Sequence, residues 1–368
     1  MLDFIESMKT VAATNLPAEH AQATAEAGAV KRIIKRLLGR FVISAAEMLP
    51  RTRTILKPLG MRTSQDLFGD RIVTIQFASA RSFRLTNVDE SYFGFQLFWR
   101  GGDYYEPITR ALLEALLRPG DTFLDIGAHL GFFSLTTGRF SRGIKIIAFE
   151  PNPKNFRALQ ANVAANDLEK VTCEAIAVSD KDGEAALYLT ESDMSASLMK
   201  DFQAEDTKQI GSIQVSTASL DSYLERQRIT GPLVVKVDIE GHEPAFFRGA
   251  SQTIATRKPD IILEVLYDQD PALVSHLKSL GYRFYPITDE GLVEIETPKL
   301  IKRFPFLFLN HLLSARPRQE IADISGRLRE QVARINLLAT SKHFPKEEWP
   351  GLWLERGSEA SDNAADQG

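Results

Sequence analysis

Acidic and imidazole side chains follow a short apolar run in the C-terminal half of the chain. The run Leu233–Val237 is followed by Asp238, Glu240 and His242. Because side chains alternate along extended backbone, we expect Asp238 and Glu240 on one side, with His242 beyond the turn at Gly241. Carboxylates and imidazole can take a proton from a hydroxyl group, and histidine does so near neutral pH. We therefore predict Asp238, Glu240 and His242 as catalytic residues.

Two other interpretations of these acids stay open. Together with Glu264 in a later apolar run, Asp238 and Glu240 offer oxygen ligands that suit Mg²⁺. Since no firm ligand spacing supports this, a divalent cation is considered but not favoured, and the metal ligands stay unassigned. Alternatively, Asp238 caps the next helix, Glu240 is a solvated acid at the strand end, and His242 is a hydrogen-bonded surface residue.

A glycine-rich segment, Phe123–Phe133, predicts a strand, a tight turn and the start of a helix. Gly127 lets the chain turn without a Cβ, and Gly131 lets backbone approach a ligand at the helix N-terminus. A dinucleotide site would have glycine where His129 stands, to admit a pyrophosphate. S-adenosylmethionine has no pyrophosphate, and Asp125 can favour its ammonium group or else stabilise the turn. The candidate cofactor-binding residues of this segment are Asp125, Gly127, Ala128, His129 and Gly131.

The next two expected strands end in further candidate cofactor residues. Glu150 follows the apolar run Lys145–Phe149, at the spacing of an acid that accepts hydrogen bonds from both ribose hydroxyls. Its alternative role is that of a solvated strand-end acid. Asn152 lies in the same Glu-Pro-Asn-Pro turn, and Ala177, near the end of the third strand, is expected against the adenine ring.

Such residues need a scaffold in which strands alternate with helices. Short apolar runs separated by helical segments predict a mainly parallel, doubly wound α/β sheet, whose ligands lie at the carboxyl ends of the strands. A closing pair of strands is expected near the C-terminal edge, and residues 190–211 are expected to be a loop. The expected strands are 122–126, 145–149, 171–178, 233–237, 261–266, 282–287 and 292–296.

The flanking segments differ from this core. Residues 1–103 are expected to be a helical and β-hairpin extension, 104–300 the main domain, 301–357 a helical or lid segment, and 358–368 a disordered tail. Asn310 and His311, in the apolar piece 304–313, are considered for a substrate pocket, and 321–338 is expected to be a helix.

The amphipathic pattern around Ile33, Leu37 and Phe41 predicts a basic helix, which either packs on the main domain or lies on an anionic membrane surface. Nine basic residues surround it, opposed only by Glu47: Lys31, Arg32, Lys35, Arg36, Arg40, Arg51, Arg53, Lys57 and Arg62.

Composition limits the class of protein. Of 368 residues 44% are hydrophobic, and the net charge is -4, which indicates a globular protein and argues against a nucleic-acid partner. The one cysteine, Cys173, excludes an internal disulfide and fits a reducing compartment. Neither a signal-like N-terminus nor a long apolar run is evident. A cytoplasmic location is therefore expected, with contact at the membrane periphery as the alternative; composition does not indicate an oligomeric state.

Several segments together resemble the FkbM-type methyltransferases. Their order and spacing carry the resemblance, which runs from about Tyr104 to Leu266. His129 departs from the family pattern, which usually has asparagine there. The segments are Tyr105–Pro107, Asp125–Ser134, Ala148–Pro153, Asn155-Phe156, Ala177–Gly183, Ser219–Tyr223 and Lys236–Gly241.

The resemblance implies a Rossmann-like methyltransferase fold, with a seven-stranded sheet and an antiparallel C-terminal edge. It also implies S-adenosylmethionine as cofactor and, commonly, O-methylation of a sugar or another small molecule, so a small-molecule or glycan acceptor is expected. Two rival functions remain: a nicotinamide-dependent oxidoreductase, against which His129 argues, and a non-catalytic methyltransferase-fold module acting at a membrane or partner.

Overall fold

The computed structural model describes residues 34, 37–46, 56–57, 68, 71–191, 196–200, 208–266, 276–288, 291–292, 334–342 and 352. The chain forms two compact units, Met1–Asp70 and Arg71–Gly368. Within these described ranges, no helix has the length and apolar character needed to cross a bilayer. The second unit contains the sheet and the candidate site.

The main sheet of the second unit has the order β12-β11-β13-β10-β9-β3-β4-β5. From β10 to β5 the neighbours are parallel, whereas β13, β11 and the two-residue β12 pair antiparallel. This confirms the Rossmann-like, mostly parallel sheet with an antiparallel C-terminal edge. The strands are β3 (Thr122–Ile126), β4 (Lys145–Phe149), β5 (Val171–Glu174), β9 (Leu233–Val237), β10 (Asp260–Leu266), β11 (Arg283–Thr288), β12 (Gly291–Leu292) and β13 (Arg334–Thr340).

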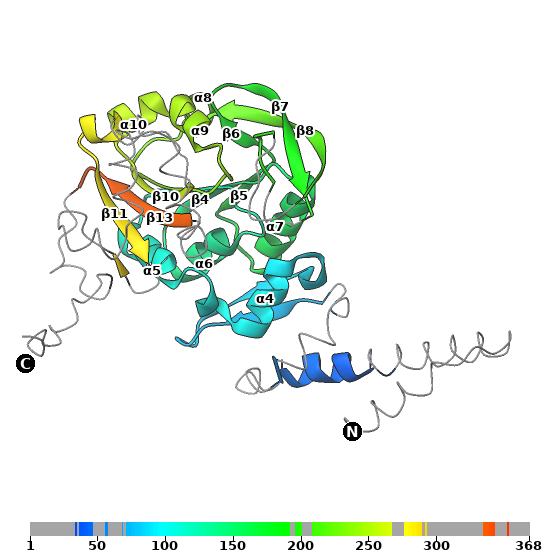
Figure 1. The fold of residues 1–368 in the computed structure, drawn as a ribbon. Coiled ribbons are helices and arrows are strands. Elements are labelled where there is room, and N and C mark those ends of the chain that lie inside the picture. Colours follow the sequence, from blue (N-terminus) through cyan, green and yellow to red (C-terminus); the bar gives the residue numbers. More distant parts are fainter. Residues whose placement is uncertain are drawn as a thin grey trace, which may run out of the picture. The chain divides into compact units, whose positions relative to one another are not determined.

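Helices cover both faces of this sheet (Figure 1). One layer is α5 (Pro107–Leu116), α6 (Phe132–Phe140) and α7 (Pro153–Ala165); the other is α8 (Leu220–Arg226), α9 (Glu243–Gly249) and α10 (Ser251–Arg257). Alternate residues of each central strand face opposite layers. Leu124 and Ile126 of β3 pack in the core beneath α8, α9 and α10, whereas Asp125 faces α6. Apolar burial on both faces thus fixes the strands whose carboxyl ends carry the site.

A hairpin and a helix precede this core within the second unit. They are β1 (Val73–Gln76), β2 (Ser82–Leu85), the 3-10 turns Val88–Glu90 and Gly102–Tyr104, and α4 (Tyr92–Arg100). Asn162 of α7 and Asn166, the residue that follows the helix, hold the hairpin: the Asn162 carboxamide oxygen accepts from Thr86 N at 2.7 Å, and that of Asn166 accepts from Arg84 N at 2.7 Å. The sequence analysis grouped this hairpin with the N-terminal extension.

A second sheet of three strands, β6-β8-β7, lies between β5 and β9 in the chain. Its strands are β6 (Ala177–Ser179), β7 (Gly183–Thr190) and β8 (Gln209–Ser219). The expected single strand 171–178 is therefore wrong: β5 pairs with β4, whereas β6 pairs with β8. The end of the expected loop 190–211 is also strand, and β8 as a whole was not foreseen because Ser212, Gln214 and Ser216 fill three of its exposed positions.

The expected helix 321–338 is wrong in its last part, where β13 lies between β10 and β11. Leu337, Leu338 and Ala339 are all buried, because a strand inside a sheet is covered on both faces. Such a continuous apolar run cannot be distinguished from a buried helix by periodicity. The lid candidate 304–313, with Asn310 and His311, and the tail 358–368 lie outside the described residues.

Candidate cofactor and methyl-transfer site

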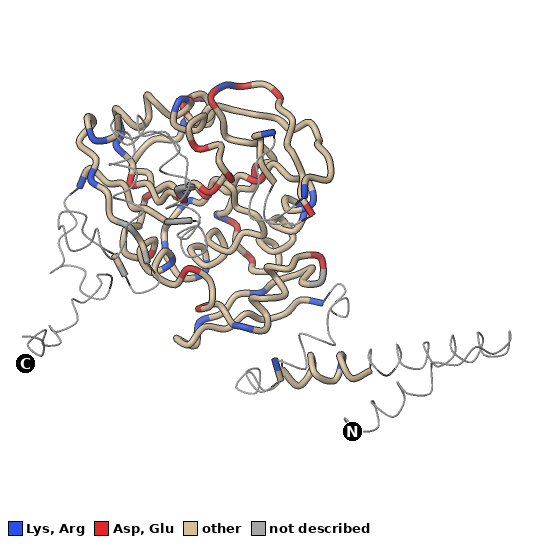
Figure 2. Tube along the Cα trace, viewed as in Figure 1, with Lys and Arg blue, Asp and Glu red and all other residues tan. Residues whose placement is uncertain are grey.

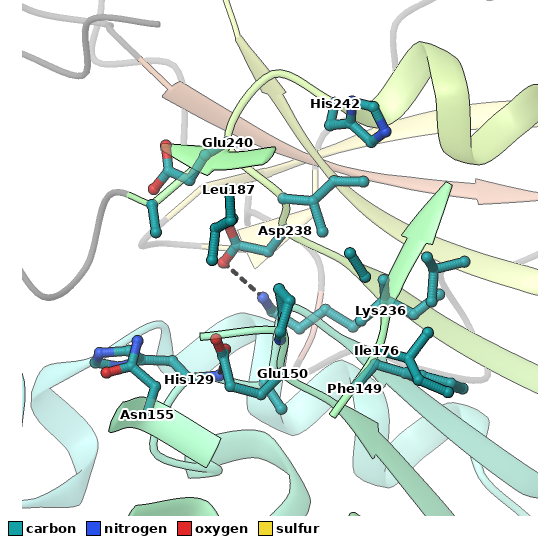
Figure 3. Close-up of a pocket in the computed structure, with 18 of the residues that line it drawn as sticks. His129, Phe149, Glu150, Asn155, Ile176, Leu187, Lys236, Asp238, Glu240 and His242 are labelled. Carbon is teal, nitrogen blue, oxygen red and sulfur yellow. Dashed lines mark hydrogen bonds and ion pairs between the residues drawn. The ribbon is translucent and has the colours of Figure 1, made fainter. Parts of the chain in front are cut away.

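An open pocket lies at the carboxyl ends of β3, β4 and β9. This is the edge of a parallel sheet at which ligands of this architecture bind. The turn after β3 and the segment after β4 form one side, and the segment after β9 forms another (Figure 3). Residues of the three-stranded sheet and of the preceding segments complete the walls, so the pocket joins parts of the chain far apart in sequence.

The turn after β3 packs closely between the ends of β4 and β9. The backbone N–H groups of Gly127 and Ala128 both donate to Phe149 O of β4, at 3.0 and 2.9 Å. Gly127 has a φ of 83°, and a Cβ there would lie 1.8 Å from Asp238 O. Only glycine meets both demands at this position. The turn therefore fixes the spacing between the cofactor loop and the acids after β9.

Replacing Gly127 with alanine is expected to lower the free energy of unfolding by about 3 kcal/mol or more, since backbone cannot yield as a side chain does and the left-handed φ adds strain. Urea denaturation measures this. Gly281→Ala is the matched control, because Gly281 also has a positive φ, 88°, but open space around its Cβ position. Equal losses in the two variants would contradict the close approach to Asp238.

Glu150 lies at the carboxyl end of β4 and is 6% exposed. One carboxylate oxygen accepts from His129 N at 2.8 Å, and the other accepts from Asn152 N at 2.9 Å. Burial raises the pKa of Glu150, while His129 and the two backbone N–H groups oppose that rise. Each oxygen keeps a further lone pair, so the carboxylate is oriented by the chain and can still accept hydrogen bonds from a ligand.

Of the other predicted cofactor-binding residues in the turn after β3, some line the pocket and one does not. Ala128 and His129 line the pocket, and His129 has a left-handed φ of 52° with its ring centroid 5.7 Å from that of Phe93. Gly131, with a φ of 91°, approaches Leu159 so closely that a Cβ would lie 2.6 Å from its Cδ1. Gly131 therefore serves helix packing, and it does not line the pocket.

Asp125 and Asn152 do not line the pocket; their side chains make contacts that stabilise the fold. Asp125 is 1% exposed, and its Oδ2 accepts from the N and Oγ of Ser134, which ties α6 to β3. Burial raises the pKa of Asp125, while Lys236 and Ser134 oppose that rise. Asn152 caps α7 by accepting from Lys154 N. Ala177 does line the pocket, as predicted.

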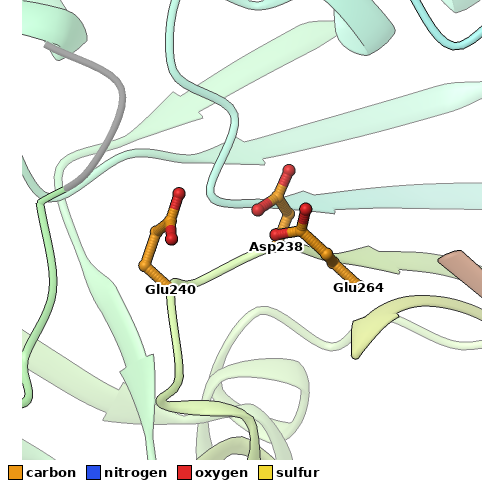
Figure 4. Close-up of side chains that lie close together, drawn as sticks. All are labelled: Asp238, Glu240 and Glu264. Atoms are coloured by element: carbon orange, nitrogen blue, oxygen red, sulfur yellow. The ribbon is translucent and has the colours of Figure 1, made fainter. Parts of the chain in front are cut away.

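Three carboxylates meet beside this pocket. Asp238 and Glu240 follow β9 and Glu264 lies on the adjacent β10; oxygens of all three lie within 4.8 Å of one another (Figure 4). Oxygen ligands at this spacing are able to hold a hard cation such as Mg²⁺. The order of the strands brings together acids that the sequence separates by 26 residues.

A buried lysine, which the sequence analysis did not assign a role, pairs with this group. Lys236 lies on β9, is 2% exposed, and donates from Nζ to Asp238 Oδ2 at 2.8 Å (Figure 3). Its Nζ also lies 4.7 Å from the ring centroid of Phe133. Burial lowers the pKa of Lys236, but Asp238, Glu106 and Asp125 together raise it above its ordinary value. Lys236 is therefore a permanent cation beneath Asp238.

The turn after β9 is held from two sides. Glu240 has a left-handed φ of 54°, which is strained for a residue with a side chain, and its carbonyl oxygen accepts from Ser197 Oγ at 2.7 Å. Glu243 is fully buried, and its Oε1 accepts from Ile239 N and Gly241 N. The surroundings thus impose the backbone that places Asp238 and Glu240.

Burial raises the pKa of Glu243 to about 7, above its ordinary 4.5. The folded state prefers the protonated acid, so this group's contribution to stability is greatest below about pH 4.5 and is lost towards pH 7. Glu243→Gln is expected to remove about 3 kcal/mol of this pH dependence. Urea denaturation of both proteins at about pH 4.5 and pH 7.5 measures the difference; parallel pH profiles would contradict the burial effect.

His242 lines the pocket but has a partner of its own. Its Nε2 lies 2.9 Å from Ser179 Oγ of β6, and it precedes α9. Burial lowers the pKa of His242, which favours neutral imidazole. The three predicted catalytic residues therefore line one pocket, with Asp238 beside Lys236 and His242 beside Ser179.

Several lining residues were missed by sequence reasoning. Tyr105 and Phe93 stack edge-to-face, with centroids 4.6 Å apart, and Leu187 and Leu198 form an apolar wall. Glu106, next to Tyr105 in the chain but not part of the pocket lining, has a φ of 39° and accepts at Oε2 from the Asn336 side chain at 2.8 Å. Non-glycine residues in the left-handed region at the pocket are a signal of function, but a sequence does not reveal backbone angles.

The strand order defines a Rossmann-like fold, with the pocket at the carboxyl edge of its parallel strands. Residues 125–284 match the model of the methyltransferase FkbM domain. The matched region, less than half of the chain, is similar to the FkbM methyltransferases, and the chain is an S-adenosylmethionine-dependent methyltransferase.

Two curated relatives agree with this family. The hexuronic acid methyltransferase AglP of Haloferax volcanii is 27% identical over 202 residues, which cover 54% of this chain and 76% of AglP. The 31-O-demethyl-FK506 methyltransferase FkbM of Streptomyces tacrolimicus is 28% identical over 197 residues, covering 45% of this chain and 74% of FkbM. A solved precorrin-6y C5,15-methyltransferase from Geobacter metallireducens GS-15 is 16% identical, covers 48% of this chain and 72% of its own, and gives a TM-score of 0.28. The fold described above rests on the strand order and not on that likeness.

Proposed function

We propose that the chain methylates a hydroxyl oxygen of a sugar or another small molecule. The observation that carries this proposal is a single pocket with the oriented carboxylate of Glu150 in one wall and Asp238 in another. The names of the two relatives, one acting on a hexuronic acid and one on 31-O-demethyl-FK506, support an oxygen acceptor. That the acceptor is a sugar or another small molecule with a hydroxyl group is itself part of the proposal.

The pocket residues fit S-adenosylmethionine, which supplies an electrophilic methyl group when bound. Glu150 accepts from the ribose hydroxyls, in addition to its two backbone donors. Ile176, Ala177 and Val178 offer an apolar surface for the adenine ring. The Gly127 turn brings backbone close to the ligand without side-chain obstruction.

Asp238 accepts the proton of the acceptor hydroxyl as the new bond forms. Its Oδ2 accepts from Lys236 Nζ, which orients the carboxylate at the pocket wall. Glu240 contributes a second carboxylate that orients the acceptor. His242, paired with Ser179, is the alternative base.

The cluster of carboxylates near the pocket favours an acceptor that carries no negative charge. Asp238, Glu240 and Glu264 lie close together, and Lys236 supplies one balancing charge. A carboxylate on the acceptor would meet repulsion there, whereas neutral hydroxyls would find several acceptors. We therefore expect neutral sugars to be preferred over uronic acids.

A divalent cation is possible at these acids but is not favoured, because Lys236 already supplies a positive charge at Asp238. Protein treated with EDTA is expected to keep its full rate of methyl transfer. Dependence of that rate on added Mg²⁺ would instead assign Asp238, Glu240 and Glu264 as ligands.

The test is transfer of tritium from methyl-labelled S-adenosylmethionine to a panel of UDP-linked hexoses and hexuronic acids. We expect labelled product, with the methyl group on oxygen by mass spectrometry, and faster transfer to the neutral sugars. Labelling of nitrogen acceptors alone, or hydride transfer from a nicotinamide in its place, would overturn the proposal.

A further inference from the structure

An exposed apolar row lies in the first unit, on the helical residues around 34–41. Ile34 is 58% exposed, Leu37 62%, Leu38 37% and Phe41 69%. Their spacing of three and four residues places them along one helix face. Val42, Ile43 and Ala46, farther along the same helix, are buried, so the helix has distinct covered and exposed sides.

This concentration is unusual within the described part of the chain. The other exposed large apolar side chains there are scattered: Ile72, Tyr92, Tyr104, Met199 and Ile210. Single exposed apolar residues are ordinary on protein surfaces, whereas a contiguous row marks an interaction surface. The row therefore requires an explanation that the scattered residues do not.

The charge around the row identifies its partner. Nine lysines and arginines lie between residues 31 and 62, opposed only by Glu47. Arg40 is the one charged residue within 37–46, so Figure 2 shows no acidic segment on that helix. A helix with an exposed apolar face in a strongly basic segment suits the surface of an anionic bilayer, where phosphate groups attract lysine and arginine.

We propose that the exposed row of Ile34, Leu37, Leu38 and Phe41 docks the protein on a membrane surface containing anionic lipid. Ile34, Leu37 and Phe41 enter the boundary between headgroups and acyl chains, and the surrounding basic residues contact lipid phosphates. The row is too short to span a bilayer, so the helix lies in the plane of the interface. The row belongs to the first unit and the methyl-transfer pocket to the second, and the proposal does not rest on the proposed acceptor.

Flotation of the full-length protein with vesicles tests the proposal. We expect it to float with vesicles of phosphatidylcholine mixed with phosphatidylglycerol, and not with phosphatidylcholine alone. Combining Leu37→Ser with Phe41→Ser is expected to weaken binding by roughly tenfold or more, as is combining Lys35→Glu with Arg36→Glu. High salt should weaken the binding of the wild-type protein.

Ile210→Ser is the matched control, because Ile210 is 61% exposed on β8 and lies in the second unit, apart in sequence from the basic segment 31–62. It should float as the wild type does, and every variant should bind S-adenosylhomocysteine equally. Absence of wild-type flotation overturns the proposal, as does an equal loss in Ile210→Ser. A melting temperature lowered by Leu37→Ser with Phe41→Ser, with flotation retained, would show that the row packs within the protein and also overturns it.

Discussion

Asp238→Asn is expected to reduce the rate of methyl transfer by about 10²- to 10⁴-fold, the usual contribution of a positioned base. The amide is nearly isosteric with the carboxylate but cannot take the hydroxyl proton. It also removes the negative partner of buried Lys236 Nζ, which lies 2.8 Å from Asp238 Oδ2. Single-turnover formation of labelled product, with the best acceptor of the sugar panel, measures the effect.

The same variant should bind S-adenosylhomocysteine with little change, since the cofactor contacts proposed above come from Glu150 and the Gly127 turn. Asp167→Asn is the control for the chemical change, because Asp167 is paired with Arg84 outside the pocket and its side chain is 81% exposed. A rate for Asp238→Asn within a few-fold of the wild type would transfer the role of base to another residue, with His242 first to be tested.

Glu150→Ala is expected to weaken S-adenosylhomocysteine binding by roughly two orders of magnitude or more. Hydrogen bonds to a charged group are worth about 1.5–3 kcal/mol each, and two ribose hydroxyls would lose their acceptor. The variant also frees His129 N and Asn152 N from the carboxylate that orients them. Calorimetric titration of both proteins measures the loss.

Glu184→Ala is the control for this loss, because Glu184 is an exposed acid on β7 that does not line the pocket. Glu150→Gln separates charge from shape, since its amide would turn a donor towards at least one backbone N–H. We expect it to bind more weakly than the wild type. Undiminished binding by Glu150→Ala would contradict the assigned ribose contact.

The core of the fold was predictable because strong local signals coincide there. The segments around Gly127 and Glu150 combine an apolar strand, a turn and a helix start, and β3 and β4 have the predicted bounds. Burial on both faces gives such strands continuous apolar runs. β13 was mistaken for helix for the same reason, since a short buried run has no diagnostic period.

The site was predictable only in part. Asp238 and Glu150 stand directly after apolar strands, so the sheet rule locates them. Asp125, within β3, and Asn152, in the turn after β4, lie near the same strand ends, yet they bind Ser134 and Lys154 N. Lys236 was not foreseen as a site residue, since its role beside Asp238 depends on the burial of its side chain, which no local pattern encodes.

Hydrogen–deuterium exchange of the wild-type protein with and without S-adenosylhomocysteine tests the central claim most directly, because it reports both binding and its place. We predict slower exchange in peptides covering 125–133, 149–156 and 236–243, with none of this protection in the β1–β2 hairpin. Unchanged exchange at saturating ligand, or protection confined to other segments, would contradict the assignment of this pocket to the cofactor.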